Sequence, residues 1–336
     1  MPAPKQTDPT AMRLWRALMC ACLLLGALPA LAARPYIYPP GSTPRFRHLS
    51  GEDGLATSDV TAVLQDAQGY MWIATDGGLQ RYDGYNFVTY SHDARTADSL
   101  AENFVTSLAL APDGSLWAGT QDAGLDRFDP ATGRFTHHMH DGEKTESLGN
   151  DQVSTLLFDR EGRLWVGTDK GLDRLDKGAG VFRHYHTGST QPNGDRILSL
   201  YEDPDGRLWV GSDHGVYRYD AKHDALERYV PATGDAAALT ALETAPVNVF
   251  CSTRGGELWI GTEHGLAVLG RDGSLRAFHT AKPGDAGALQ SDHVRGLLEA
   301  LSGGMWVIGL HGGLSRYDAH DGRFTTYLHD ASDPAS

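Results

Sequence analysis

The sequence has little cysteine, little positive charge and few long apolar runs. Of its 3 cysteines, Cys20 and Cys22 lie in an N-terminal segment that we expect to be removed, so Cys251 alone would remain and no intrachain disulfide framework could form. Lys and Arg number 29 against 43 Asp and Glu, which gives a net charge of -14. Such a chain lacks the basic surface that binds phosphate backbones or anionic lipids, so nucleic acid is not expected as a partner.

One long uncharged run does occur, close to the N-terminus. A short basic segment at residues 12–16 precedes residues 17–33, which carry no charge and end with Ala30 and Ala32 on either side of Leu31, as at a signal-peptidase site. We predict a signal peptide over residues 1–33, with Met12 as an alternative start, and a linker over residues 34–45. An uncleaved membrane anchor is the alternative, since this run is close to the length that spans a bilayer. Both interpretations place the remainder of the chain outside the cytoplasm.

A repeated unit fills the rest of the sequence. Six tryptophans recur at intervals of 45, 48, 44, 50 and 47 residues. In every copy an aliphatic residue lies twelve positions before the tryptophan and a glycine lies three positions before it, as Val153 and Gly162 do before Trp165. The register of the copies is therefore fixed without gaps on this side, which indicates one structural unit repeated six times. The six tryptophans are Trp72, Trp117, Trp165, Trp209, Trp259 and Trp306.

Each copy is predicted to form four short strands. In the first copy, residues 60–64, 71–75, 79–82 and 87–90 are rich in β-branched, aromatic and apolar side chains, and glycine-containing turns separate them. No segment long enough for a core helix shows the helical period. Four antiparallel strands in a repeat of this length are typical of a β-propeller blade, so we predict an all-β propeller over residues 46–330.

The two ends of the repeat array predict a further blade. Phe46-Arg47-His48-Leu49 matches the fourth-strand pattern but has no first three strands before it, and residues 331–336 resemble the start of the next inter-blade connector. Propellers close by pairing strands from both termini in one blade, because an open ring would leave sheet edges unpaired. We therefore expect a seven-bladed ring of four-stranded blades, with six complete and the seventh truncated, and a chain that is a fragment of a longer protein.

The stretch from Gly69 to Asp83, GYMWIATDGGLQRYD, resembles the repeat of the two-component regulator propeller family, and residues 53–55 and 58–60 are similar to its usual opening. The resemblance covers residues 45–330. It implies a periplasmic sensor propeller of a hybrid histidine kinase-like or diguanylate cyclase receptor, whose inner-membrane anchor and output domain are not in this chain. It also implies that the full-length receptor associates as a dimer. Family members in gut bacteria respond to oligosaccharides, which implies a carbohydrate or similar polar ligand.

Candidate ligand-binding residues gather on one face of the predicted propeller. The turns between strands two and three share this face with the long connectors between blades, such as residues 91–103 and 229–246. In several copies an acid follows the tryptophan by four positions and Lys or His follows it by five, and the starts of the first strands add polar groups. Charges of both signs that converge on the axis suit a hydroxyl-rich or anionic small ligand, with no cofactor and no metal. The candidates are Asn103, Asp122, Asp169, Lys170, Asp195, Arg196, Asp213, His214, Glu263, His264, Asp292, His293 and His311.

Several of these patterns also have structural explanations. An Asp before Gly can accept hydrogen bonds from the backbone of its own turn. The tryptophans are suited to packing between blades, and the Arg-x-Asp motifs of the third strands are suited to linking strands or turns. His137, His138 and His140, on a predicted outermost strand, suit a solvated surface. Two other functions stay open beside the sensor: a secreted lyase or hydrolase in which Glu263 and His264 act as acid and base, and a protein-docking scaffold. We favour the sensor, because no nucleophile motif or metal-ligand spacing supports an enzyme.

Overall fold

The computed structural model describes residues 46, 48–176, 178, 180–190, 194–282, 284–329 and 332. The predicted signal peptide and linker lie outside the described residues, as does nearly all of the connector predicted at residues 331–336. No helix in this described part of the chain is both long and apolar enough to cross a lipid bilayer.

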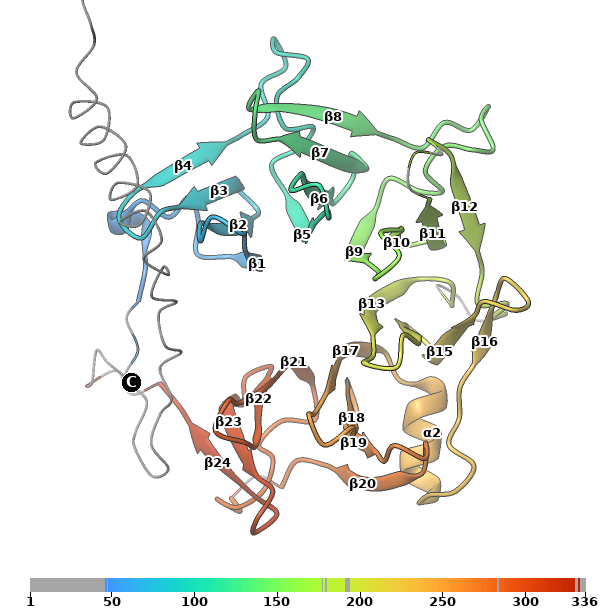
Figure 1. Ribbon diagram of the computed structural model, residues 1–336. Coiled ribbons are helices and arrows are strands. Elements are labelled where there is room, and N and C mark those ends of the chain that lie inside the picture. Colours follow the sequence, from blue (N-terminus) through green and yellow to red (C-terminus); the bar gives the residue numbers. More distant parts are fainter. Residues whose placement is uncertain are drawn as a thin grey trace, which may run out of the picture. The chain divides into compact units, whose positions relative to one another are not determined.

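The described residues form six four-stranded antiparallel sheets, and within each sheet the strands lie side by side in chain order. The first strand of every sheet, or blade, lies innermost, and in Figure 1 these strands face a common axis. Blades 1 to 3 are β1 to β4 (Val60–Gln65, Met71–Thr75, Gly78–Tyr82, Phe87–Tyr90), β5 to β8 (Val105–Leu110, Leu116–Thr120, Leu125–Asp129, Arg134–His138) and β9 to β12 (Val153–Phe158, Leu164–Thr168, Gly171–Leu175, Phe182–Tyr185). Blades 4 to 6 are β13 to β16 (Ile197–Glu202, Leu208–Ser212, Gly215–Asp220, Ala225–Arg228), β17 to β20 (Val247–Ser252, Leu258–Thr262, Gly265–Leu269, Leu275–His279) and β21 to β24 (Val294–Glu299, Met305–Gly309, Gly313–Asp318, Arg323–Tyr327).

The expectation of a seventh, truncated blade is wrong. The propeller has six blades, all complete, and the described residues of the segment 46–49 form no strand. A position two residues after the tryptophan shows how blade 6 differs from the others. At this position Gly167 lies so close to Ile197 of the next blade that a Cβ atom would meet its side chain at 2.8 Å, and blades 2, 4 and 5 also have glycine there. Blade 6 has Ile308 instead, which is 51% exposed, so its second strand lacks the small residue that the other blades have where the next innermost strand packs.

Five of the six tryptophans pack between neighbouring blades, as the structural interpretation of the repeat predicts, while Trp306 of blade 6 contacts Tyr327 of its own blade. Trp165 is fully buried, and its ring centroid lies 4.7 Å from that of Tyr219 in blade 4. Its indole Nε1 donates a hydrogen bond of 2.7 Å to Asp159, and Trp72 and Trp209 make the same bond to the Asp six positions before them. The hydrophobic core is therefore divided among the interfaces between consecutive blades.

Side-chain hydrogen bonds join the innermost strands around the axis. Thr61 Oγ1 donates to the Val105 carbonyl at 2.5 Å, and Thr106 Oγ1 donates to the Val153 carbonyl at 2.6 Å. Each innermost strand has a register shift at this point, and such a bulge re-aims the side chain beside it. Blades 3 to 5 repeat the link to the next blade through Ser154, Ser199 and Asn248.

A helix that the sequence did not predict forms in the connector between blades 4 and 5. Helix α2 (Ala236–Thr244) begins after Asp235, whose side chain accepts hydrogen bonds from the amides of Ala237 and Ala238. This cap and the alanine-rich run that follows it favour a helix more strongly than the weak periodicity of the segment suggests. Leu242 of the helix is fully buried in the core of blades 4 and 5. The only other helical segment among the described residues is a single turn, η1 (Gly51–Asp53), before β1.

Of the three histidines predicted to be solvated, His140 is exposed and lies beyond the end of β8, whereas His137 and His138 belong to the blade structure, which corrects the prediction for these two. His137 Nδ1 lies 2.5 Å from Asp126, which is buried, and His138 stacks on the tryptophan of its blade with ring centroids 5.2 Å apart. Blade 3 repeats the first pair with His184 and Asp173 at 2.7 Å. Both carboxylates also accept hydrogen bonds from connector amides, so each His–Asp pair fastens a connector to its blade.

Candidate functional site

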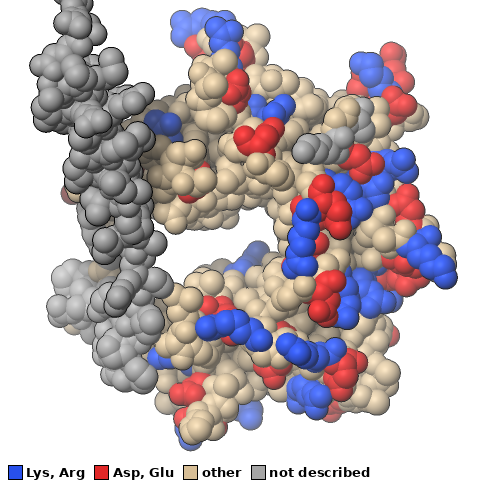
Figure 2. Space-filling view, viewed as in Figure 1, with Lys and Arg blue, Asp and Glu red and all other residues tan. Residues whose placement is uncertain are grey.

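A polar cavity of about 320 Å³ lies at the axis, on the face that carries the connectors. Three kinds of position build it: the residue directly before an innermost strand, the second residue of an innermost strand, and the turn between second and third strands. Antiparallel pairing places all three at the same end of each blade. Figure 2 shows a hollow at the axis, with acidic and basic side chains adjoining on its inner rim over blades 3 and 4. The polar lining residues are Thr61, Thr106, Gln121, Gln152, Ser154, Asp169, Arg196, Asn248 and Arg295.

Arg196 connects two neighbouring turns at the rim of this axial cavity. Its Nε lies 2.9 Å from Asp169 Oδ1 in the turn of blade 3, and its Nη1 lies 3.9 Å from Asp213 Oδ2 in the turn of blade 4. Burial raises the pKa of Asp213, and the guanidinium of Arg196 counteracts this effect. The structure thus brings three of the predicted residues together as one ion-pair group.

Blades 5 and 6 place a second group beside the first. Glu263 Oε1 lies 3.3 Å from His293 Nε2 of the next blade, a contact without hydrogen-bond geometry, and among the described residues it is not paired with its neighbour His264, its expected partner in acid–base catalysis. Burial lowers the pKa of His293, and Arg295 acts in the same direction while Glu263 opposes it. Arg295 lines the axial cavity, is exposed, and makes no hydrogen bond or ion pair within the described ranges.

Three of the predicted residues fasten connectors to the innermost strands. Asn103 accepts a hydrogen bond from the amide of His92 at 2.7 Å, and Asp292 accepts one from the amide of Ala281 at 2.6 Å. Asp195 binds the amide and the hydroxyl of Thr187 at 2.8 and 2.7 Å. These oxygens are occupied by the connectors, which gives the residues a structural role at the edge of the site.

Lys170, His214 and His264 share one turn position, where the backbone amide donates to the Thr or Ser hydroxyl two residues earlier at 3.0 to 3.2 Å. The Lys170 and His264 residues are exposed. The His214 ring differs from these side chains: its Nδ1 is buried and has no hydrogen-bond partner in the part of the chain that the structure describes. His311 is exposed and has a left-handed backbone with φ 58°. None of the four lines the axial cavity.

Seven polar residues of the axial cavity were not among the sequence candidates: Thr61, Thr106, Gln121, Gln152, Ser154, Asn248 and Arg295. Gln152 Nε2 donates to Asp122 Oδ1 at 3.1 Å, which places the predicted Asp122 just behind the lining. The aligned repeats contained a signal for the last two residues. The residue directly after the invariant aliphatic position is Thr or Ser in blades 1 to 3 but Leu, Asn and Arg in blades 4 to 6, whereas the predicted strand-start candidates all lie before that position.

One group of described residues has the geometry to hold a metal ion, and it lies on an outer hairpin. Asp220, His223 and Glu227 each offer a ligand atom within 4.8 Å of the others. They belong to the turn and strands around β15 and β16, and His223 is hydrogen bonded to Asp220. The group is away from the axial cavity, so it adds nothing to the chemistry there.

Comparison with known families identifies the repeat. Residues 54–77, 99–122, 147–170 and 191–214 match the model of the two component regulator propeller. The recognition of this repeat from the sequence is therefore confirmed. No curated protein matches the sequence.

Solved structures share the propeller fold at low sequence identity. The extracellular domain of a candidate hybrid two component system from B. thetaiotaomicron is 22% identical with a TM-score of 0.52, over 81% of this chain and 41% of that one. PorZ, a surface component of the type-IX secretion system of Porphyromonas gingivalis, is 17% identical with a TM-score of 0.60, over 77% of this chain and 38% of that one. Virginiamycin B lyase from Staphylococcus aureus is 12% identical with a TM-score of 0.59, over 81% of this chain and 86% of that one. The chain thus spans about two fifths of the length of the first two structures.

Proposed function

We propose that this chain, which carries two component regulator propeller repeats, is the ligand-sensing part of a membrane-spanning signalling protein. In this proposal the propeller lies on the periplasmic or extracellular side, exported by an N-terminal signal, and passes its signal to a kinase or cyclase output in a part of the protein outside this chain. The repeat itself and the likeness to an extracellular domain of a two component system support the proposal.

The ligand we propose is a small carbohydrate or similar polar molecule in the axial cavity. Its volume of about 320 Å³ is at the small end of the range for ligand pockets, which suits one or two sugar rings. The single observation that carries the ligand chemistry is Arg295, a guanidinium without a protein partner among the described residues beside a polar cavity. Because a guanidinium binds a carboxylate in two parallel hydrogen bonds, an acidic sugar is the preferred ligand.

The other lining groups suit sugar hydroxyls. The hydroxyls of Thr61, Thr106 and Ser154 already donate to backbone carbonyls of the next blade, so toward the cavity they offer acceptor lone pairs. The side-chain amides of Gln121 and Asn248 offer both a carbonyl and N–H groups. A ligand hydroxyl needs both kinds of partner, and the axial cavity supplies them from several blades.

The test is a calorimetric titration of the protein with neutral and uronic acid-containing disaccharides. We expect an acidic disaccharide to bind, and Arg295→Gln to weaken that binding by about 10- to 100-fold, since a hydrogen-bonded charge is lost. The matched control is Arg134→Gln on the outermost strand β8, whose guanidinium is 72% exposed and pairs with Asp98 at 3.1 Å. If Arg295→Gln and Arg134→Gln bind the ligand equally well, the axial cavity is not the site.

A further inference from the structure

One position in the third strand of each blade faces the tryptophan ring of the preceding blade, and the residue type at this position decides whether another aromatic ring packs on that tryptophan. An aromatic residue of the next blade covers it in three interfaces, with ring centroids 4.7 to 5.2 Å apart. These pairs are Trp72 with Phe128, Trp165 with Tyr219, and Trp259 with Tyr317. At the other two interfaces between consecutive blades the position is Leu175 or Leu269, which leaves space beside the tryptophan.

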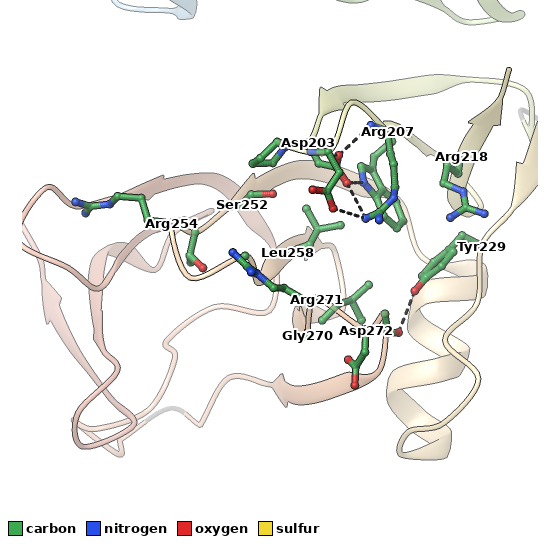
Figure 3. Close-up of a pocket in the computed structure, with 17 residues that line it drawn as sticks. Asp203, Arg207, Arg218, Tyr229, Ser252, Arg254, Leu258, Gly270, Arg271 and Asp272 are labelled. Atoms are coloured by element: carbon green, nitrogen blue, oxygen red, sulfur yellow. Dashed lines mark hydrogen bonds and ion pairs between the residues drawn. The ribbon is translucent and has the colours of Figure 1, made fainter.

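The space beside Leu269 is a cavity of about 630 Å³ between blades 4 and 5. It opens at the turns formed by residues 203–207, 253–256 and 270–273, which join first to second and third to fourth strands. These turns lie at the end of the blades opposite the axial cavity, so this interblade cavity is a separate feature. Figure 3 shows it with Leu258 and Tyr229 on its walls and with Arg218 and Arg271 on opposite sides.

Most charges that line the interblade cavity are already neutralised. Asp203 accepts a hydrogen bond from the Trp209 indole at 2.9 Å, and Arg207 lies 3.0 Å from Asp205. Two further lining residues pair with partners outside the cavity: Asp272 with Arg276 at 3.1 Å, and Arg254 with Glu299 at 3.0 Å. Only the guanidiniums of Arg218 and Arg271 remain without an ion pair or hydrogen bond to a described residue.

The preceding blade shows what Arg218 lacks. Arg174 occupies the same position in blade 3, where it donates to the hydroxyl of Tyr219 at 2.7 Å and pairs with Asp176 at 2.8 Å. In blade 4 the tyrosine of the next blade is replaced by Leu269, and Asp220, the acid two residues after the arginine, is bonded to His223 instead. Arg218 has therefore lost both partners and faces the cavity beside Tyr229, 5.9 Å from the ring centroid.

On the opposite side of the cavity from Arg218, the Arg271 side chain packs closely against Gly256. Gly256 has a φ of +85°, and a Cβ atom there would collide with the Arg271 side chain. The glycine therefore gives room for the arginine to lie against the turn of blade 5. The cavity beside Leu175 provides the contrast: it measures about 330 Å³, and its arginine, Arg127, pairs with Asp113 at 2.9 Å.

We propose that the interblade cavity between blades 4 and 5 binds a small organic dicarboxylate. One carboxylate pairs with Arg218 and the other with Arg271, because these are the two unneutralised charges on opposite sides of the space. The apolar body of the ligand packs on Trp209, Leu258 and Leu269, which line the wall between them. This site is distinct from the sugar-binding site proposed above in place, ligand and residues.

The experiment is a calorimetric titration of the full chain with terephthalate, whose two carboxylates stand on a rigid aromatic ring. Benzoate, inorganic phosphate and the uncharged terephthalamide are the comparison probes. We expect terephthalate to bind more tightly than benzoate, and terephthalamide and phosphate to bind weakly or not at all. Arg218→Gln and Arg271→Gln should each weaken terephthalate binding by about 10-fold or more, while Arg134→Gln leaves it unchanged.

A variant that fills the cavity gives an independent readout. Leu269→Tyr introduces the tyrosine that blades 4 and 6 have at this position, where it covers the tryptophan of the preceding blade. The protein should therefore stay folded and lose terephthalate binding. The matched control is Leu175→Tyr at the same position between blades 2 and 3, which should bind terephthalate like the unmodified protein. The proposal is overturned if terephthalate does not bind at millimolar concentration, or if terephthalamide or phosphate binds as tightly as terephthalate. It is also overturned if both arginine variants, or a folded Leu269→Tyr variant, keep the full affinity for terephthalate.

Discussion

Replacing Trp165 by Phe tests how much of the blade interface depends on a buried hydrogen bond. Trp165 is fully buried and donates to Asp159 Oδ2 at 2.7 Å, and that oxygen also accepts Arg163 Nε at 2.6 Å. The phenyl ring leaves a small cavity and removes the donor from a buried carboxylate. We expect the free energy of unfolding to fall by about 2–4 kcal/mol, of which about 1.5–3 kcal/mol comes from the lost hydrogen bond to a charged group.

Trp117→Phe is the matched control, because Trp117 is 6% exposed and its indole makes no hydrogen bond to a described residue. Its loss should be about 1–2 kcal/mol, from packing alone. Urea denaturation followed by circular dichroism gives both values on one scale. Equal losses in the two variants would refute the role assigned to the Trp–Asp bond, and Trp165→Ala, at about 3–5 kcal/mol, sets the upper limit.

Three further predictions concern the framework of the blades. The bond to Asp173 raises the pKa of His184 above its usual 6.5, so its contribution to stability is complete below pH 6.5 and is lost as the pH rises through the raised pKa; the midpoint of urea denaturation should fall as the pH rises above 6.5, and His184→Asn should flatten that dependence. Gly167→Val should cost about 2 kcal/mol or more, measured by urea denaturation, because its side chain would collide with Thr155 and Ile197; an unchanged stability would remove the explanation given for this glycine. Asp195→Ala should lower stability by about 1–2 kcal/mol through the lost connector bonds yet leave sugar affinity unchanged, and a selective loss of affinity in calorimetry would restore Asp195 to the binding site.

The blade could be predicted because its signals are local and repeated. Val153 and Gly162 stand at fixed distances before Trp165, and the same spacing recurs in every copy, so six copies reinforced one another. The number of blades was predicted wrongly because that prediction depended on one short match. Residues 46–49 fit the fourth-strand pattern over only four positions, and their described residues form no strand.

The site was harder to predict because acids at two regular positions of the repeat have different roles. Asp169 and Asp213 share an arginine at the rim, while Asp195 and Asp292 hold connectors, yet all four are acids at regular spacing. The sequence marks Arg295 only as a departure from the Thr or Ser at this position in blades 1 to 3, and sequence spacing does not show the register shift that aims the second residue of the strand. Departures from the repeat, more than the repeat itself, mark the residues that face the cavities.

A crystal structure of the protein soaked with an acidic disaccharide that binds in titration tests the central claim most directly. We predict density for the sugar in the axial cavity, with its carboxylate paired to the Arg295 guanidinium and its hydroxyls within hydrogen-bonding distance of Asn248 and Gln121. Sugar density elsewhere, on the connectors or between blades 4 and 5, with the axial cavity holding only solvent, would contradict it.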